Sequence, residues 1–259
     1  MNSVFTRAGL IPLLAFLMSG GVLAQTKSKV PAKKAPVKSI GAPSKPATIV
    51  TEPWRQLNTK ERLVEISTDY GVMVAKLYDS TPLHRNNFVK LVEQKFYDSL
   101  LFHRVIDQFM IQGGDPLSKN APDSVHLGTG SAPGNRVPAE FKSYFFHKKG
   151  ALAAARDNNP DRASSNCQFY IVHGKVMPEQ ELNNVFDQRV KASNPNFNYS
   201  KKQREVYARI GGTPFLDQAY TVFGEVISGL DVIDKIARTP KDGSDRPLQN
   251  VRMRIRLLN

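Results

Sequence analysis

The chain has 259 residues, of which 41% are hydrophobic and 23% are charged, so it can bury a sizeable core and lacks the composition of a disordered protein. Its single cysteine excludes an intrachain disulfide framework and a cysteine cluster that could hold zinc or an iron–sulfur centre. Lysine and arginine outnumber aspartate and glutamate by 36 to 23, and the net charge of +13 suggests at first a nucleic-acid-binding protein.

The first 24 residues have the pattern of a secretory signal peptide. Arg7 precedes an apolar run, Ala8 to Met18, and the small-residue segment 19–24 supplies an A-x-A-like cleavage site. The run is too short to span a bilayer, which needs about 20 apolar residues, so we expect cleavage after Ala24 rather than a retained anchor. This predicts an exported protein of the bacterial periplasm. Entry into an endoplasmic reticulum is the alternative, but the C-terminus lacks a retention tetrapeptide.

Residues 25–50 are rich in lysine, proline and alanine and contain no acidic residue. Proline favours extended backbone and the like charges repel, so this segment is interpreted as a disordered, solvated spacer. Its six lysines and Arg7 carry seven of the thirteen net charges, which leaves +6 for residues 51–259. We therefore expect a plain linker and no nucleic-acid partner; weak electrostatic contact with an anionic envelope surface is the alternative for the spacer.

Residues 51–259 are expected to form one mainly β domain. Two β-branched runs, 63–68 and 72–78, flank a turn signal and predict a hairpin. Further strands are predicted from short apolar or alternating runs at 150–155, 168–173, 220–226 and 251–257. In the last run arginines alternate with apolar residues, and we interpret them as a solvated face of the sheet.

Two helices are predicted to accompany these strands. The first follows the hairpin, because Pro82 suits the first helical position, Ser80 or Thr81 can cap it, and apolar residues recur at helical spacing. The second, over residues 230–237, is predicted from its apolar spacing alone.

A polar segment at about 178–210 interrupts the strand pattern. Asn194-Pro195-Asn196 divides it into two helices, and Ser200 with Gln203 resembles a capping box that starts the second. Gly211-Gly212 ends that helix. We interpret the segment as an inserted helical hairpin, which is either a partner surface or an elaborated loop.

Several common sites are missing from the sequence. Gly128-Thr129-Gly130 lacks the spacing of a dinucleotide-binding loop, and there is no nucleophile elbow, phosphate-binding loop or zinc-protease motif. The five histidines are scattered singly and are interpreted as structural, and Cys167 is interpreted as a small buried thiol. No metal and no cofactor are therefore expected.

The most informative stretch runs from Phe102 to Asp115, with the sequence FHRVIDQFMIQGGD. It combines an arginine, a glutamine and exposed-looking Phe and Met side chains, and it ends in a glycine pair that permits a sharp bend. This stretch resembles the signature of the cyclophilin family of peptidyl-prolyl cis–trans isomerases. Two more blocks, within 150–171 and 215–226, resemble the family's other motifs in the same order, so the resemblance covers about residues 64–257.

The resemblance implies a closed eight-stranded antiparallel β-barrel capped by two helices, with the helical hairpin at 178–210 inserted. It implies that Arg104 is the catalytic residue. It further implies a substrate-binding set that consists of Phe109, Met110, Gln112, Ala155, Arg156, Gln168, Tyr170, Phe215, Leu216 and Tyr220. Four positions of this set depart from well-known members, which have Asn at 156, Phe at 170, Trp at 215 and His at 220; outside the set, Asn166-Cys167 replaces the usual Gly-Ser. The missing tryptophan argues against tight cyclosporin binding.

The implied activity is rotation about X–Pro bonds, which would assist the folding of exported proteins. Amide resonance sets a barrier of about 18–20 kcal/mol, but no bond breaks, so neither a nucleophile nor a cofactor is needed. Arg104 would donate to the carbonyl of the substrate proline and favour the rotated nitrogen. The expected partners are proline-containing unfolded or extended segments, and a monomer is expected. The alternative is a module that binds proline segments with little or no turnover.

Overall fold

The computed structural model describes residues 61–122 and 125–259. The predicted signal peptide (1–24) and spacer (25–50) lie outside the described residues, as does the start of the predicted domain, 51–60. Across the two described ranges, no helix is both long enough and apolar enough to cross a membrane.

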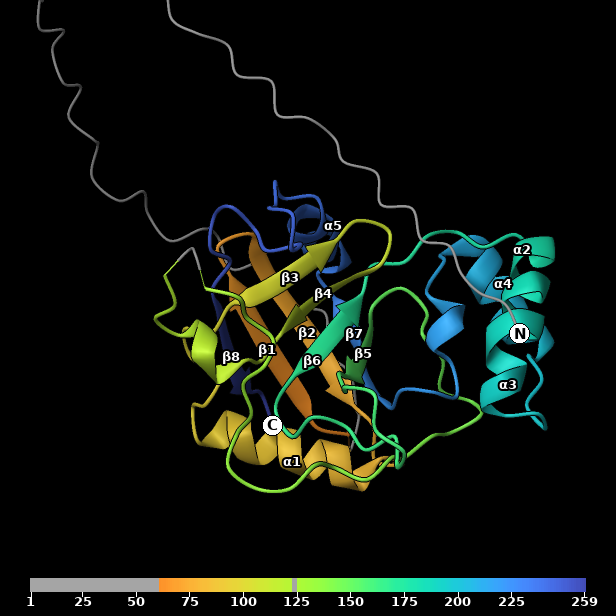
Figure 1. Ribbon diagram of the computed structural model, residues 1–259, viewed down its shortest axis with the longest axis horizontal. Coiled ribbons are helices and arrows are strands. Elements are labelled where there is room, and N and C mark those ends of the chain that lie inside the picture. Colours follow the sequence, from red (N-terminus) through yellow and green to blue (C-terminus); the bar gives the residue numbers. More distant parts are fainter. Residues whose placement is uncertain (1–60, 123–124) are drawn as a thin grey trace, which may run out of the picture. The chain divides into compact units, whose positions relative to one another are not determined.

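The described chain is built on one eight-stranded sheet whose ladders are all antiparallel (Figure 1). The order of strands across it is β3-β4-β6-β5-β7-β2-β1-β8. In chain order the strands are β1 (Leu63–Thr68), β2 (Gly71–Leu77), β3 (Phe102–Ile106), β4 (Met110–Gly113), β5 (Ala151–Ala154), β6 (Phe169–Val172), β7 (Val222–Ser228) and β8 (Met253–Leu257). The predicted hairpin is confirmed, since β1 and β2 form an antiparallel pair that ends at the turn, where Thr68 lies opposite Gly71.

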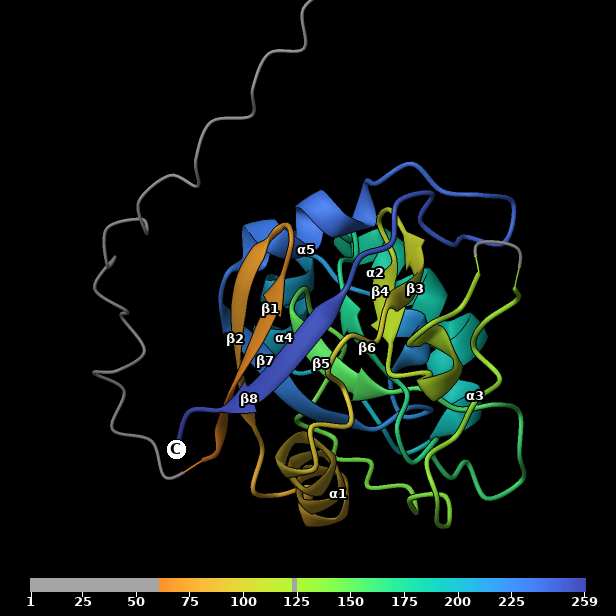
Figure 2. The same ribbon diagram turned by 90° about the vertical axis from the view of Figure 1, so that its left-hand side faces the viewer.

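The sheet curls into a half-barrel, as Figure 2 shows, with β3 and β8 as its outermost strands. These two strands meet near their starts, through the isolated bridge between Leu101 and Arg252 and through backbone hydrogen bonds from the amide of Phe102 to the carbonyl of Val251 at 2.9 Å and from the amide of Met253 to the carbonyl of Leu100 at 2.8 Å. Farther along β3, the amide of Val105 donates to the carbonyl oxygen of Asp245 at 2.8 Å. The loop before β8 therefore occupies the edge of β3 that a closing strand would need. The prediction of eight antiparallel strands is confirmed, in one curled sheet; farther along β3 a loop, and not β8, lies beside it.

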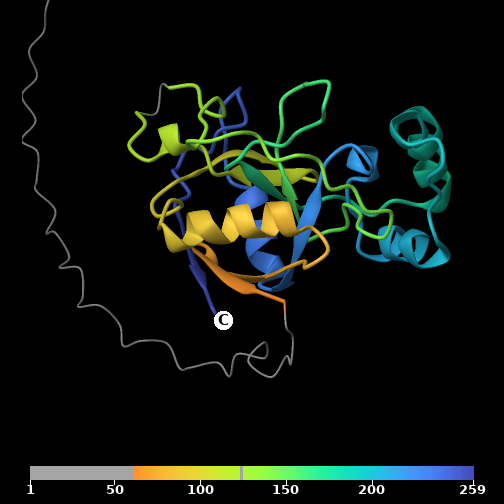
Figure 3. The same cartoon turned by 90° about the horizontal axis from the view of Figure 1, so that it is seen from below.

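Two helices cover the ends of the curled sheet, as predicted. Helix α1 (Pro82–Glu93) and helix α5 (Leu230–Ala237) lie at opposite ends of it in both side views (Figures 1 and 2). Figure 3 shows α1 from below, lying across the sheet. Each helix buries one apolar stripe, with Phe88, Leu91 and Val92 on α1 and Val232, Ile233 and Ile236 on α5.

The start of α1 is capped differently from the prediction. Thr81 occupies the N-cap position, but its hydroxyl donates to the carbonyl of Tyr78 and accepts nothing from the helix. The carboxylate of Glu140, from a distant loop, accepts from the amides of Leu83 at 3.1 Å and His84 at 2.9 Å. A carboxylate suits these unsatisfied amides and the positive end of the helix dipole.

The predicted helical insertion is confirmed between β6 and β7, at one side of the sheet in Figure 1. It consists of α2 (Glu179–Val185), the π-helical turn η3 (Phe186–Val190), α3 (Lys191–Ser193) and α4 (Lys201–Arg209). The capping box of Ser200 and Gln203 is formed as predicted. The insertion has a small core of its own, made of Met177, Leu182, Val190, Phe197, Tyr199 and Tyr207.

We expect the concave core of the sheet to tolerate truncation poorly. Phe169 is 1% exposed and makes edge-to-face contacts with Phe88, Tyr97 and Phe102. Phe169→Ala should therefore lower the free energy of unfolding by about 3–5 kcal/mol, measured by urea denaturation. Leu248→Ala is the matched control, because that side chain is 67% exposed. Equal stability of the two variants would contradict the packing described.

Candidate functional site

The site is built on the outer face of four neighbouring strands. Alternation along each strand sends one set of side chains into the core and the other set outward. The outward set consists of Arg104 and Ile106 on β3, Met110 and Gln112 on β4, Tyr170 and Val172 on β6, and Ala151 and Ala153 on β5. Side chains therefore pack on both faces of these strands. We call the face that carries the outward set the outer face, and it forms the floor of the site.

Strand register aligns the polar residues of the outer face. Arg104 pairs with Gln112 across β3 and β4, Gln112 pairs with Tyr170 across β4 and β6, and Tyr170 pairs with Ala153 across β6 and β5. A register shift in β3 between Phe102 and Arg104 lets both Phe102 and Val105 reach the core. This irregularity aims Arg104 outward, which is a common use of bulges beside binding sites.

An apolar cluster adjoins this row. Met110 and Tyr170 are buried, and Phe109, Leu216 and Tyr220 pack partly exposed against them. Phe215 is 41% exposed. Its ring lies 5.5 Å from that of Phe109, centroid to centroid. Leu216 and Phe215 come from the short turn η4 (Pro214–Leu216), which follows the helical insertion.

Gln112 is held in place by a second glutamine. Its Nε2 donates to Oε1 of Gln168 at 3.2 Å. Nε2 of Gln168 in turn donates to the carbonyl oxygens of Gly128 at 2.9 Å and Gly130 at 2.8 Å. Because both carbonyls demand a donor, the amide of Gln168 has one orientation, and its oxygen is turned toward Gln112.

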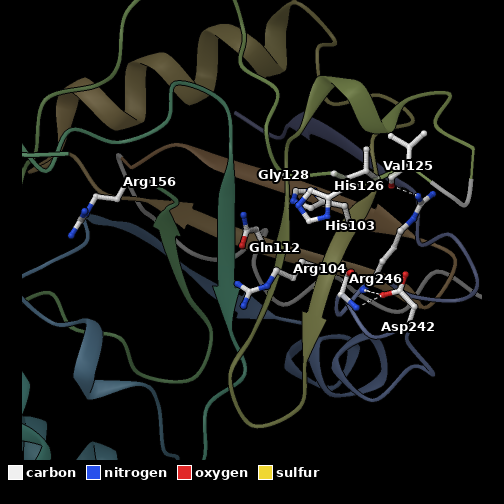
Figure 4. Close-up of a pocket in the computed structure, with 11 residues that line it drawn as sticks. His103, Arg104, Gln112, Val125, His126, Gly128, Arg156, Asp242 and Arg246 are labelled. Atoms are coloured by element: carbon white, nitrogen blue, oxygen red, sulfur yellow. Dashed lines mark hydrogen bonds between the residues drawn. The ribbon is translucent and has the colours of Figure 1, made fainter. Parts of the chain in front are cut away.

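The guanidinium of Arg104 lines a cavity of about 410 Å³ together with His103, Gln112 and loop residues 125–128 (Figure 4). Its side chain is 41% exposed, and Nε lies 3.7 Å from Oδ2 of Asp245. Within the two described ranges it makes no other ion pair or side-chain hydrogen bond. Its two terminal nitrogens are therefore available to a ligand.

A second cavity of about 530 Å³ adjoins the first and shares Gln112, Gly128 and Arg156 with it. The Arg156 guanidinium is held by groups beside the cavities: Nε donates to the carbonyl of Ala219 at 3.0 Å, a terminal nitrogen donates to the carbonyl of Asp157 at 2.9 Å, and its carbon lies 4.5 Å from the centroid of Tyr220. Arg156 thus ties the loop after β5 to the loop before β7. Ala155 is fixed by a hydrogen bond from its amide to the carbonyl of Gln168 at 3.0 Å.

The structure brings every predicted site residue onto one connected surface. Sequence reasoning missed the loop that walls the cavities, residues 125–130, and the loop that carries Asp242, Asp245 and Arg246. Asp115 holds the first loop, because its carboxylate accepts from the amide of Gly128. No local pattern marks these loops, since they lie in the site only through contacts with distant strands.

His103 is buried beneath the cavity, and neither ring nitrogen has a hydrogen-bond partner within residues 61–122 and 125–259. Burial lowers the pKa of its imidazole to about 4, and the charges of Arg104 and Arg246 add to this while Asp115 opposes it. The ring is therefore neutral at ordinary pH. In the described part of the chain, no group of three or more His, Cys, Asp or Glu side chains is arranged to hold a metal.

Comparisons with known proteins agree with this geometry. The family described as cyclophilin type peptidyl-prolyl cis-trans isomerase/CLD matches residues 63–256. A putative peptidyl-prolyl cis-trans isomerase of Staphylococcus haemolyticus is 34% identical over 198 residues, which cover 76% of this chain and 91% of that protein. One of Staphylococcus aureus strain USA300 is 34% identical over 203 residues, with 76% and 94% covered.

Solved structures show the same fold. A cyclophilin-type peptidyl-prolyl cis-trans isomerase of Cryptosporidium parvum superposes with a TM-score of 0.55 at 23% identity, covering 77% of this chain and 98% of that one. The same protein crystallised in the presence of the dipeptide Ala-Pro gives a TM-score of 0.52 at 22% identity, with 76% and 99% covered.

We expect His103 to make the fold sensitive to acid. Its pKa in the folded protein, about 4, lies below the value of about 6.5 for an unfolded chain, so the unfolded state binds more protons between these values. The stability that the neutral ring contributes is complete above pH 6.5, falls with decreasing pH, and is lost below pH 4. The loss amounts to about 3 kcal/mol.

The variant His103→Leu isolates this effect, because it cannot take up the proton and all other titrating groups are unchanged. Urea unfolding of both proteins between pH 7 and pH 4 should show a steeper loss for the wild type. Parallel curves would contradict the assignment.

Proposed function

The chain belongs to the cyclophilin-type peptidyl-prolyl cis–trans isomerase family, and we propose that it rotates X–Pro bonds of exported proteins on the outer face built around Arg104. The observation that carries the assignment of the site is the alignment of Arg104 and Gln112 beside the apolar cluster of Met110, Tyr170 and Leu216. A proline ring needs such an apolar surface, and the rotating amide needs a donor at its edge.

The reaction demands little chemistry from the protein. The barrier of about 18–20 kcal/mol arises from amide resonance, which is lost when the C–N bond twists and the nitrogen becomes pyramidal. An acceleration of four decades requires about 5.4 kcal/mol of selective stabilisation. One well-placed cationic donor and a fixed substrate orientation can supply that amount.

Arg104 is the proposed donor. Its planar, permanently charged guanidinium can donate to the carbonyl oxygen of the substrate proline and favour the localised lone pair on the rotated nitrogen. Asp245, 3.7 Å from Nε, restrains the side chain from the edge of β3. Asp245 approaches Nε of Arg104 and also accepts from Nζ of Lys241 at 2.5 Å. The terminal nitrogens of Arg104 therefore stay free to bind substrate.

Gln112 and the backbone at residue 156 are proposed to bind the peptide on either side of the proline. Gln112 is oriented by Gln168, so its remaining polar atoms have a defined direction. The backbone amide and carbonyl of Arg156 have no partner within residues 61–122 and 125–259, whereas its guanidinium is fixed on Ala219. An extended peptide could pair with that backbone, and the replacement of the family's usual asparagine by Arg156 leaves this pairing intact.

The proposed substrate is a proline-containing peptide segment. The Cryptosporidium parvum structure, crystallised with Ala-Pro, supports this class of ligand by family resemblance. Export of the protein is proposed from the pattern of residues 1–24, and the folding of other exported proteins follows as its role. Nothing in the proposal assigns particular client proteins.

The role of Arg104 can be tested with Arg104→Ala. Losing a donor to the transition state should lower kcat/KM by about 10- to 1,000-fold. Arg104→Lys keeps the charge but not the fork-shaped donor and should be intermediate. The readout is a protease-coupled isomerisation assay on a proline tetrapeptide.

Arg254→Ala serves as the matched control, because that arginine is 73% exposed on β8, outside the site. It should retain full activity. Wild-type protein without turnover would favour the alternative of a proline-binding module, and an Arg104→Ala variant as active as wild type would overturn the mechanism.

Export can be tested by N-terminal sequencing of the protein recovered from the periplasm of a bacterial host. We expect mature protein that begins at Gln25. Replacing Ala24 with a bulky residue, Ala24→Leu, should block processing, because the cleavage site requires a small side chain. Recovery of unprocessed protein that begins at Met1 from wild-type cells would refute the assignment.

A further inference from the structure

A buried series of hydrogen bonds links the helical insertion to the apolar cluster of the site. Tyr199 and Tyr207, from the insertion, both donate to Oδ2 of Asp217, at 2.7 and 2.6 Å. Oδ1 of Asp217 accepts from the backbone amide of His147 at 2.8 Å and lies 2.7 Å from its ring Nδ1. Nε2 of His147 lies 2.9 Å from the hydroxyl of Tyr170.

Chemistry sets the direction of these bonds. The Asp217 carboxylate only accepts, so Nδ1 of His147 carries the proton, and in the neutral ring Nε2 accepts from Tyr170. Burial raises the pKa of the hydroxyls of Tyr170, Tyr199 and Tyr207, so each keeps its proton at ordinary pH. Every bond in the chain is therefore satisfied from one end to the other.

The side chains at the centre of this series of hydrogen bonds are buried. Asp217 and His147 are each 1% exposed or less in their side chains, and Tyr207 is fully buried. A buried carboxylate is costly unless several donors surround it, and here four donors do so, two of them from the insertion. Loss of the hydroxyl of Tyr199 or Tyr207 would leave the Asp217 carboxylate with one donor fewer. The positions of the other groups that contact this carboxylate should then shift.

Those groups belong to the site. Tyr170 stands on the outer face, in register between Gln112 and Ala153. Asp217 directly follows Leu216 in the turn η4, and Tyr199 also donates to the carbonyl of Pro214 at 3.3 Å. The insertion is therefore linked by hydrogen bonds both to Tyr170 on the sheet and to the turn that carries Leu216.

The base of the insertion is too tightly packed to act as a loose hinge. Its two ends cross at Gly174 and Gly212, where a Cβ on Gly174 would lie 2.4 Å from the Cα of Gly212. A Cβ on Gly212 would lie 2.1 Å from the carbonyl oxygen of His147. The backbone that carries His147 is thus clamped against the same segment that carries the two tyrosines.

We propose that the insertion is a positioning element for the apolar cluster that receives the proline: Tyr199 and Tyr207 act through Asp217 and His147 to fix the ring of Tyr170 and the turn at Leu216. This rests on the proposed function, since it assumes that the proline binds against this cluster. The hydroxyl that distinguishes Tyr170 from the family's usual phenylalanine then has a role, because it is the group through which His147 and the insertion position the ring.

The test is a double-mutant cycle with Tyr207→Phe and Tyr170→Phe. An apolar side chain that contacts the proline does so in the ground state and the transition state alike, so misplacing it should raise KM by about three- to tenfold and change kcat by less than about twofold. Because the two hydroxyls act in one chain, the rise in KM for the double variant should fall well short of the product of the two separate rises.

Tyr144→Phe is the matched control, because it removes an exposed hydroxyl from outside the chain of hydrogen bonds, and it should leave KM unchanged. Circular dichroism and thermal melting confirm that each variant is folded at the assay temperature. Should Tyr207→Phe fail to fold, Tyr199→Phe replaces it in the same cycle. Rises in KM that multiply, or a Tyr207→Phe variant identical to wild type, would overturn the proposal.

Titration of the same four proteins with an Ala-Pro tetrapeptide, followed by NMR, separates this proposal from the proposed function. If the wild type binds the peptide without turnover, the isomerase assignment of the site fails, and the coupling is still read from the dissociation constants. If the wild type turns over the peptide and the cycle shows no coupling in KM or in binding, only the role of the insertion fails.

Discussion

Backbone hydrogen bonds between β3, β4 and β6 set Arg104, Gln112 and Tyr170 in one row, and the rest of the site depends on that register. Side chains alternate along a strand, so a slip of one residue would turn Arg104 into the core and a core residue such as Ile111 toward the substrate. The register shift at His103 lets Phe102 point into the core while Arg104, two residues later, points outward.

Carboxylates hold the segments around that row. Glu140 caps α1, Asp115 holds the loop at Gly128, and Asp217 gathers the two tyrosines of the insertion with His147. Each of the three accepts hydrogen bonds from another segment of the chain, so the loops around the site are tied to their neighbours.

Part of the positive charge of the described chain lies on β8, outside the site. On β8, Arg254 and Arg256 are strongly exposed, and Arg256 donates to Glu65 on the neighbouring strand at 2.7 Å. These arginines alternate with the buried Met253 and Ile255, which agrees with the predicted solvated face. The charge that we propose to act on the substrate is that of Arg104, whose terminal nitrogens are left available to a ligand.

The amino-acid sequence by itself determined the elements that local chemistry defines. The β1–β2 hairpin, the helices α1 and α5, the capping box at Ser200 and the strands at 151–154, 169–172, 222–228 and 253–257 follow from side-chain periodicity and turn residues. The motif around Arg104 likewise identified the family, because its residue types occur in an unusual combination.

Only the tertiary structure decided how the sheet ends and what surrounds the site. The loop that pairs Asp245 with Val105 in place of a closing strand, the capping of α1 by Glu140, and the path from Tyr207 to Tyr170 all join residues far apart in the chain. Periodicity and turn chemistry report on neighbours within a few residues. The partners of a buried polar group depend instead on which segments packing brings together, and no local pattern carries that information.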